Sequence, residues 1–403
     1  MKKRIKIFLL LGLTLILVIS GCAKNSELSK KEKLEDFNKL YKVLKENYPY
    51  FKVQKRKTGY NWLAHKDKFE TMIANTQNNV EFYEVLKKIV QKVENGHTKV
   101  VGPQSYQKLK KLYNNVSKKE KYKDKVVPWV KVINNEKTKE TYSLLLKQFR
   151  EYKDNQKDVS NKSSYPEDKL KFKIIKDNKI AYVKIPRFSQ DKRKKDYNKL
   201  IEFWKKTKDY SHLIIDIRGN SGGSDFYWIK NIVQPLLINP IEFKTYSAYK
   251  GGNYSIPFIK ARVDKLYSTE ELPNSKNYPP EVEKNFKYFS KKIKKIEPKN
   301  SIKFSGDIYV LVDKAVYSAS ETFSVFCKST NWATLIGEKT GGDGIGFDPI
   351  FFSLPNSGLL IRFPVDMGLK PNGKANEEYH TVPDIRTNTP LKKVLNIIDR
   401  SDE

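Results

Sequence analysis

The chain has 403 residues, 38% of them hydrophobic, and carries 78 Lys and Arg against 46 Asp and Glu, a formal net charge of +32. This length and apolar content suffice for hydrophobic cores and predict two domains. The basic residues are scattered in small groups without a zinc-finger, basic-zipper or RNA-binding signature. We therefore exclude nucleic acid as a partner and interpret the charge as a solvated, lysine-rich surface, with attraction to anionic lipid or wall polymer as a side effect.

The N-terminus has the pattern of a bacterial export signal. Four basic residues within positions 2–6 precede an apolar run over residues 7–19, which is shorter than the roughly 20 residues needed to span a bilayer. The run ends in Ile19-Ser-Gly-Cys22, which resembles a lipobox. We predict a signal peptide over residues 1–21 and a lipoprotein anchored through acylated Cys22 to the extracytoplasmic face of the cell membrane. The alternative is an uncleaved anchor with an incidental cysteine.

Cysteine usage excludes a disulfide framework. The only cysteine besides Cys22 is Cys327, so acylation of Cys22 leaves it without an intramolecular partner. Stability must then come from hydrophobic cores.

The pattern of apolar residues divides the rest of the chain. Residues 22–34 are polar and predict a tether, and residues 35–165 show mostly helical periodicity without a clear PDZ-like module. After residue 171, short apolar runs at 180–185, 213–217, 308–312 and 333–337 alternate with helical patterns. This alternation predicts an α/β domain over residues 166–403 with parallel strands. Residues 241–300 are polar and rich in Pro and Lys, and we interpret them as an insertion.

Two serines follow predicted strands. Ser221 lies in Gly219-Asn-Ser-Gly-Gly223, which fits either a nucleophile elbow or a glycine-rich loop whose N–H groups face an oxyanion. Ser318 begins Ser-Ala-Ser-Glu321 at a strand-to-helix junction, where the helix field favours an alkoxide. The same spacing also fits a structural capping box.

Histidine is scarce, with four residues in the chain. His97, in Asn-Gly-His-Thr, fits either a helix-end structural group or a base. Glu377 and Glu378 lie before His380 and a Pro-Asp turn, where surface acids are the default interpretation. No group of residues has metal-ligand spacing and no P-loop occurs, so we expect no metal or cofactor.

Taken together and in this order, these segments resemble the C-terminal processing, or tail-specific, serine peptidase family. The opening strand at 181–188, the Asp216-Ile-Arg-Gly-Asn-Ser-Gly-Gly loop, Ser318-Ala-Ser-Glu and Gly337-Glu-Lys-Thr-Gly-Gly are similar to its motifs. The resemblance implies an N-terminal helical domain before a crotonase-like α/β peptidase core. It also implies that Ser318 is the nucleophile, and that the oxyanion hole consists of the N–H groups of Gly222 and Ala319, with Gly223 as the less favoured loop donor.

The resemblance includes one departure from the processing peptidases. The position that holds their catalytic lysine is Asp343, and Lys339 falls at the wrong place. The sequence is similar instead to the branch that includes the tricorn core protease, which pairs the serine with a histidine and a glutamate. This implies His97 as the base and Glu377 as the group that orients it, although Gly96 stands where tricorn has a serine.

The function implied is that of a membrane-tethered serine endopeptidase acting on peptides or envelope proteins. Three alternatives stay open at this stage. They are an α/β-hydrolase esterase that uses Ser221, a non-catalytic relative that binds peptide or another ligand, and an envelope protein that holds wall polymer on its basic surface.

Overall fold

The computed structural model describes residues 27–154, 169–273 and 276–401. The predicted signal peptide and Cys22 lie outside these ranges. Within them, no helix combines the length and the apolar character needed to cross a membrane.

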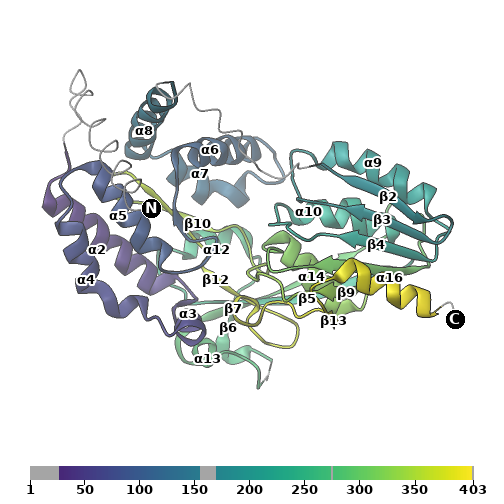
Figure 1. The fold of residues 1–403 in the computed structure, drawn as a ribbon. Helices are drawn as coiled ribbons and strands as arrows, with labels where there is room; N and C mark the ends of the chain where they lie inside the picture. Colours follow the sequence, from purple (N-terminus) through teal and green to yellow (C-terminus); the bar gives the residue numbers. More distant parts are fainter. Residues whose placement is uncertain (1–26, 155–168, 274–275, 402–403) are drawn as a thin grey trace, which may run out of the picture.

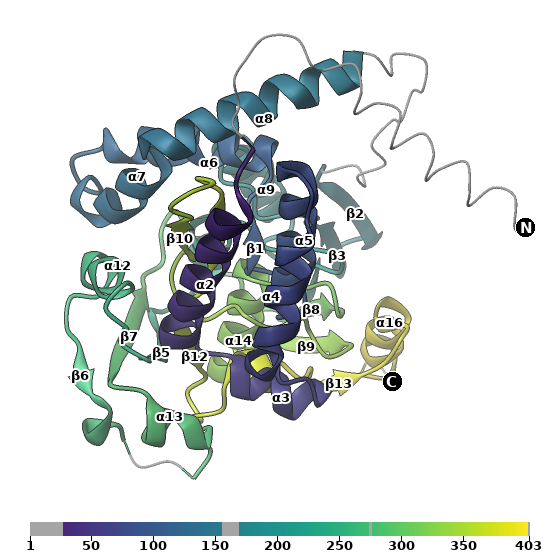
Figure 2. The same ribbon diagram turned by 90° about the vertical axis from the view of Figure 1, so that its left-hand side faces the viewer.

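Four helices open the described chain: α2 (Lys30–Asn47), α3 (Phe51–Thr58), α4 (Lys66–Ala74) and α5 (Asn79–Gln91). Helix α2 begins inside the segment predicted as a tether, because Ser29 and Glu32 form a reciprocal capping box. Its buried face, which includes Phe37, Leu40 and Leu44, follows the predicted helical period. Figure 2 shows α2, α4 and α5 lying side by side on this end of the molecule.

A second helical group follows the short strand β1 (Lys99–Val100). It consists of α6 (Pro103–Ser117), α7 (Val127–Ile133) and α8 (Glu136–Asp154). Strand β1 pairs with β11 (Leu360–Phe363), which pairs with β10 (Ile350–Ser353), so the C-terminal half of the chain contributes strands to the N-terminal region. Trp129 of α7 is fully buried and donates its indole N–H to the Pro349 carbonyl just before β10.

The core of the C-terminal part is a six-stranded sheet in the order β13-β9-β8-β4-β3-β2. Its strands are β2 (Lys171–Lys176), β3 (Ile180–Lys184), β4 (His212–Asp216), β8 (Asp307–Val312), β9 (Thr334–Gly337) and β13 (Ile385–Arg386). All neighbours pair in parallel except β2 with β3, which confirms the predicted α/β arrangement.

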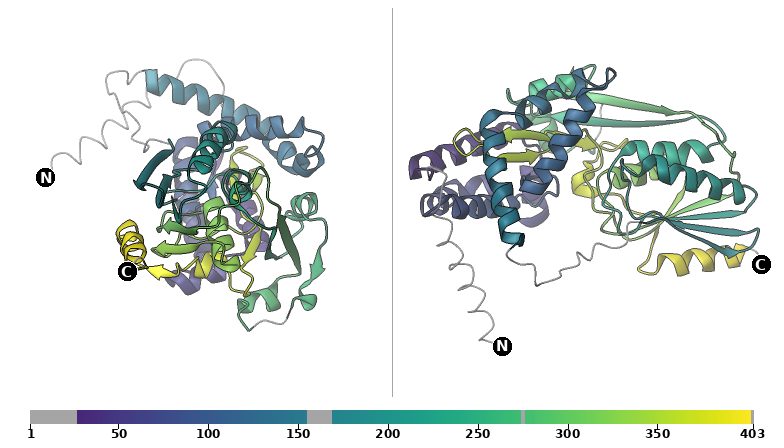
Figure 3. Two further views of the ribbon diagram at one scale, coloured as in Figure 1. Left: turned by 90° about the vertical axis from the view of Figure 1, so that its right-hand side faces the viewer. Right: turned by 90° about the horizontal axis from the view of Figure 1, so that it is seen from above.

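Helices cover both faces of this sheet. One face packs against α9 (Arg193–Lys206), α10 (Asp225–Trp228), α11 (Gln234–Leu236) and α14 (Ala319–Thr330). The opposite face packs against α16 (Pro390–Ser401), whose Val394 and Ile398 meet Ile214 and Leu311. Figure 3 shows α9 and the yellow α16 on opposite sides of the strands. Because both faces are buried, the central strands are nearly continuous apolar runs.

Residues 241–300, which we interpret from the sequence as an insertion, fold into regular helices and strands. This segment forms β5 (Ile241–Tyr249), α12 (Ile256–Arg262), β6 (Tyr267–Ser268), α13 (Pro280–Asn285) and β7 (Tyr288–Ile296). With β12 (Asp366–Leu369) its strands make a four-stranded sheet in the order β12-β5-β7-β6. Apolar side chains at 246–289 and 350–375 join the N-terminal helices in one core, so a boundary at residue 165 does not separate the two cores. Figure 1 shows this sheet between the purple helices and the core.

Candidate active site

Ser318 lies at the turn between β8 and α14 in a strained backbone conformation. Its φ of 60° and ψ of −125° place it outside the regions that ordinary L-residues occupy. Its side chain makes no cap hydrogen bond, and the Glu321 carboxylate accepts hydrogen bonds from Asn376 and Thr381 instead. The structural capping-box interpretation of Ser318 is therefore wrong. A strained turn of this kind presents the serine hydroxyl at the end of the strand, as a nucleophile requires.

The glycine loop after β4 approaches this turn closely. A Cβ on Gly222 would lie 2.5 Å from the Tyr317 carbonyl oxygen, 2.8 Å from the Ala319 nitrogen and 2.9 Å from Ser318 Cβ. Only glycine permits this approach, since its φ of 92° is also left-handed. The loop and the serine turn therefore form one site.

The backbone N–H groups of the loop are not equivalent. The Gly222 N–H donates to Asn220 Oδ1 over 2.9 Å, which commits it to the turn itself. Within the described chain, the N–H groups of Gly223 and Ala319 donate to no protein acceptor. Of the two loop glycines, Gly222 thus has its N–H engaged by the protein within the described chain and Gly223 does not.

Ser221 does not have the surroundings of a nucleophile. Its side chain is exposed and accepts a hydrogen bond from Arg187 over 3.2 Å. Among the residues that the structure describes, no histidine forms a hydrogen bond with Ser221. This geometry gives no support to the esterase alternative.

His97 reaches the site from the loop between α5 and β1. Its Nδ1 lies 2.8 Å from Asp343 Oδ2, and its ring centroid is 4.9 Å from that of Tyr317, the residue before Ser318. Asp343 follows Gly342, whose carbonyl accepts the Ser318 N–H over 3.3 Å. Within the described chain no hydrogen bond joins Ser318 Oγ to His97. In proteases such contacts commonly tighten only when substrate binds.

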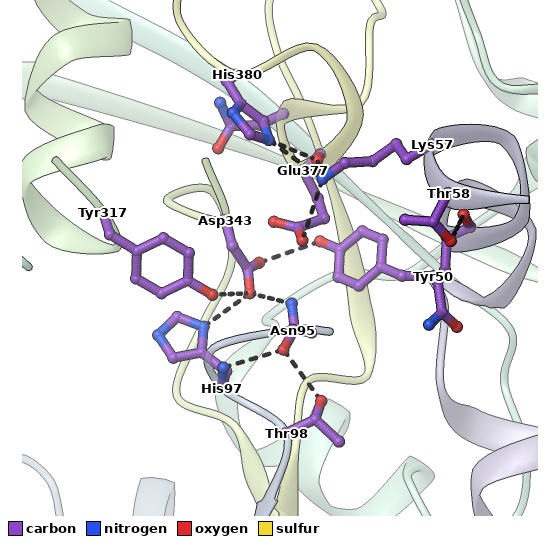
Figure 4. Close-up of polar contacts among 12 residues, drawn as sticks. Tyr50, Lys57, Thr58, Asn95, His97, Thr98, Tyr317, Asp343, Glu377 and His380 are labelled. Carbon is purple, nitrogen blue, oxygen red and sulfur yellow. Dashed lines mark hydrogen bonds and ion pairs between the residues drawn. The ribbon is translucent and has the colours of Figure 1, made fainter. Parts of the chain in front are cut away.

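Asp343 is the acceptor for a converging set of donors (Figure 4). Besides His97, Oδ2 accepts from Asn95 Nδ2 over 2.8 Å and from the Tyr317 hydroxyl over 3.0 Å. The Tyr50 hydroxyl donates to Oδ1 over 3.3 Å. Burial opposes ionisation, but the electrostatic interaction with His97 and the hydrogen bonds from His97, Asn95 and Tyr317 outweigh it, so the pKa of Asp343 is lowered. Asp343 is thus an ionised carboxylate that fixes the imidazole ring.

Glu377, which the resemblance gives as the orienting group, occupies a different position. It lies on α15 (Asn376–Tyr379), with Oε1 3.9 Å from Lys57 Nζ. No hydrogen bond joins it to His97 among the described residues, and Asp343 takes the contact with the ring instead. Burial, and then the charge of Asp343, raise the pKa of Glu377 well above its ordinary value.

His380 has polar contacts at both of its ring nitrogens. Its Nδ1 lies 2.7 Å from the Thr340 carbonyl oxygen, and its Nε2 lies 3.0 Å from the Glu377 carbonyl oxygen and 3.3 Å from Lys57 Nζ. Burial and the neighbouring charge of Lys57 lower the pKa of His380 to about 4. The ring is therefore part of the scaffold that holds α15.

The structure gives a physical reason for glycine at position 96. A Cβ there would lie 3.0 Å from both Cζ and the hydroxyl of Tyr317. The phenol of Tyr317 fills this space, and its hydroxyl bonds to Asp343. No feature of the sequence singles out Tyr317, Asn95 or Tyr50 as site residues. Asp343 was visible only as the residue at the lysine position, directly after two glycines.

Comparison with known proteins connects this geometry to proteolysis. Residues 179–387 match the sequence model of Peptidase family S41, and residues 29–91 match that of the Tricorn protease C1 domain. None of the curated proteins matches the chain. A provisionally assigned peptidase from Parabacteroides merdae aligns with 92% of this chain and 97% of its own, at 19% identity and a TM-score of 0.56. Mature CPAF aligns with 92% and 96%, at 11% identity and a TM-score of 0.54. At these identities the solved structures show the shared fold alone.

Proposed function

Because the chain belongs to peptidase family S41, we propose that it is a serine peptidase in which Ser318 attacks the peptide carbonyl and His97 is the general base. The contact between His97 Nδ1 and Asp343 carries the proposal. An ionised carboxylate only accepts hydrogen bonds, so Nδ1 must hold the proton and Nε2 is left with its lone pair. Nε2 is the nitrogen that a serine proton requires.

The proposed reaction has two halves. The Ser318 Oγ–carbon bond forms as its proton moves to His97 Nε2, and the imidazolium then protonates the leaving amine as the peptide bond breaks. Water attacks the acyl-enzyme with the same proton transfers and releases the acid. The Gly223 and Ala319 N–H groups would stabilise the oxyanion, and one such donor typically contributes about 3 kcal/mol to transition-state stabilisation.

A fluorophosphonate probe tests this proposal, because it phosphonylates only activated serines. The wild-type chain and Ser221→Ala should be labelled, and Ser318→Ala should not. Mass spectrometry of the labelled peptide identifies the serine. Loss of labelling in Ser221→Ala alone would establish the esterase mechanism. A wild-type chain that neither reacts nor cleaves peptides would instead be a binding protein.

We also propose that the peptidase is a lipoprotein on the extracytoplasmic face of the membrane, where its substrates are peptides or envelope proteins. The lipobox ending at Cys22 supports this. Cys22→Ala should move the chain from the detergent phase to the aqueous phase in a phase-partitioning experiment, since one acylated anchor is lost. Ser20→Ala is the control, because it keeps a small residue before the cysteine. Unchanged partitioning of Cys22→Ala, without acyl mass on Cys22 in wild type, would disprove lipidation.

A further inference from the structure

A small cavity lies next to the candidate active site, between α3 and α15. Its volume is about 30 Å³, and its lining includes the exposed Lys57 and Glu94 and the buried Tyr48, Gln54 and Glu377. Glu377 lies on the side of Asp343 that faces away from His97 (Figure 4). The cavity therefore reaches from the surface to the carboxyl group behind the proposed His97–Asp343 pair.

Three of the residues that line this cavity each carry a buried polar atom without a protein hydrogen-bond partner. They are the Tyr48 hydroxyl, Gln54 Oε1 and Glu377 Oε2, which are unpartnered within the described chain. Their residues are only 1%, 5% and 6% exposed, respectively. Buried polar groups in native proteins are nearly always hydrogen-bonded to protein or to ordered water. Three such atoms around one cavity indicate a single shared ligand.

The chemistry of these atoms selects the ligand. The Gln54 amide N–H donates to the Lys92 carbonyl, which identifies Oε1 as the free amide oxygen. An amide oxygen can only accept a hydrogen bond. A cation would meet Lys57, whose ammonium lies 3.9 Å from Glu377 Oε1. A water molecule needs roughly 10–15 Å³ and two to four polar partners, which this cavity provides. Water can donate to Gln54, accept from Tyr48, and either donate to or accept from Glu377.

Water therefore satisfies Glu377 in both protonation states, and the surroundings favour the neutral one. Burial and the negative charge of Asp343 raise the pKa of Glu377 well above its ordinary value, against smaller opposing effects of the Lys57 charge and of a hydrogen bond with Asn95. The other titratable groups that face or contact Glu377 are Glu321, His380, Tyr48, Tyr50 and Tyr317. Of these, Glu321 also disfavours a second negative charge.

We propose that this cavity binds one water molecule held by Tyr48, Gln54 and Glu377, and that Glu377 is kept there as a neutral carboxylic acid behind the ionised Asp343. The inference deepens the proposed function, because it makes Glu377 a positioning residue that keeps a single negative charge beside His97. Ionisation of Glu377 at alkaline pH would place a second charge there and stabilise the imidazolium. Proton transfer to the leaving amine would then slow.

Infrared difference spectroscopy of the full chain tests the proposal without requiring turnover. At a pH where ordinary carboxyl groups are ionised, the wild type should show the carbonyl stretch of a neutral carboxylic acid. Glu377→Gln should lose this band. Asp366→Asn is the matched control, since burial also raises the pKa of Asp366 to about 7, and it should remove a different band. If Glu377→Gln loses no neutral-acid band, Glu377 is ionised and the proposal is overturned.

The water molecule has its own test. Tyr48→Phe removes one of its partners and should shift the frequency of the Glu377 band. Tyr106→Phe is the control, because its buried hydroxyl bonds to the Ile133 carbonyl and does not line the cavity. An unshifted band in Tyr48→Phe would exclude a shared water.

The pH profile separates this inference from the proposed function. If the chain is a peptidase, its rate should fall at alkaline pH in wild type and should not fall in Glu377→Gln. The same alkaline fall in both chains would refute the positioning role. A chain that is inert towards peptides but keeps the Glu377 band would refute the peptidase proposal and leave the water site and the neutral acid standing.

Discussion

His97→Ala is expected to lower kcat by about 10⁶-fold, the loss found when the histidine of a serine protease triad is removed. Without the imidazole, no group accepts the Ser318 proton, and the serine remains a weak neutral nucleophile. Circular dichroism should be unchanged, because the side chain is partly exposed and its backbone turn is held separately by Asn95. The measurement is hydrolysis of a chromogenic peptide, with the probe reaction as a second readout.

Lys339→Ala is the matched control for this experiment. Lys339 is exposed on the loop that leads to Asp343, and it is the remaining candidate for a lysine base. We expect this variant to keep activity within a few-fold of wild type, the usual outcome for a surface side chain. If Lys339→Ala abolishes turnover while His97→Ala retains it, the site uses a lysine and the assignment of His97 is wrong.

The local elements of the core could be predicted from the sequence because their signals are local. The apolar runs at 213–217 and 308–312 are buried on both faces, and each ends at a loop with its own motif. The close approach of Gly222 requires a glycine, and both Gly222 and Ser318 lie in motifs that stand out in the sequence. At these two strands the apolar pattern and the motif that follows it indicate the same structure, and such agreement makes a prediction reliable.

The shared core could not be predicted in the same way. Strand β7 is rich in lysine and its burial pattern is irregular, so nothing in its own sequence identifies the partner that covers it. Pairing of β5 with β12, and of β1 with β11, joins residues more than a hundred positions apart. Contacts of this kind leave no periodic signal, so the strands within residues 241–300 could not be identified from the sequence.

Asp343 was missed for a related reason. Its role depends on Tyr50, Asn95 and His97 from one half of the chain meeting Tyr317 from the other. A carboxylate at the family's lysine position indicates only that lysine is absent. The four donors that make it an orienting group become visible only when the two halves are packed together.

Asp343→Asn is expected to lower kcat by roughly 10⁴-fold, the effect of the corresponding change in a serine protease triad. Asparagine matches the shape of aspartate, but one of its two acceptor positions becomes an N–H donor. Donors from Tyr317, Asn95 and His97 face Oδ2, so an amide nitrogen at that position would confront them, whereas an amide nitrogen at the Oδ1 position would face the Tyr50 hydroxyl. In the first orientation the imidazole would carry its proton on Nε2, where it cannot accept from Ser318. In both orientations the site lacks the negative charge that stabilises the imidazolium.

Glu377→Gln tests whether Asp343 orients His97, or whether Glu377 does so as the family resemblance implies. Glutamine also matches glutamate in shape, and if Glu377 is a neutral acid the change removes no charge from the site at neutral pH. We therefore expect kcat to stay within about tenfold of wild type, which corresponds to a change of roughly 1.4 kcal/mol or less in the activation free energy. The two variants should be compared in one peptide assay with equal active-site titres. A loss in Glu377→Gln as large as that in Asp343→Asn would return the orienting role to Glu377, whereas a large loss in Asp343→Asn alone assigns it to the carboxylate that bonds the ring.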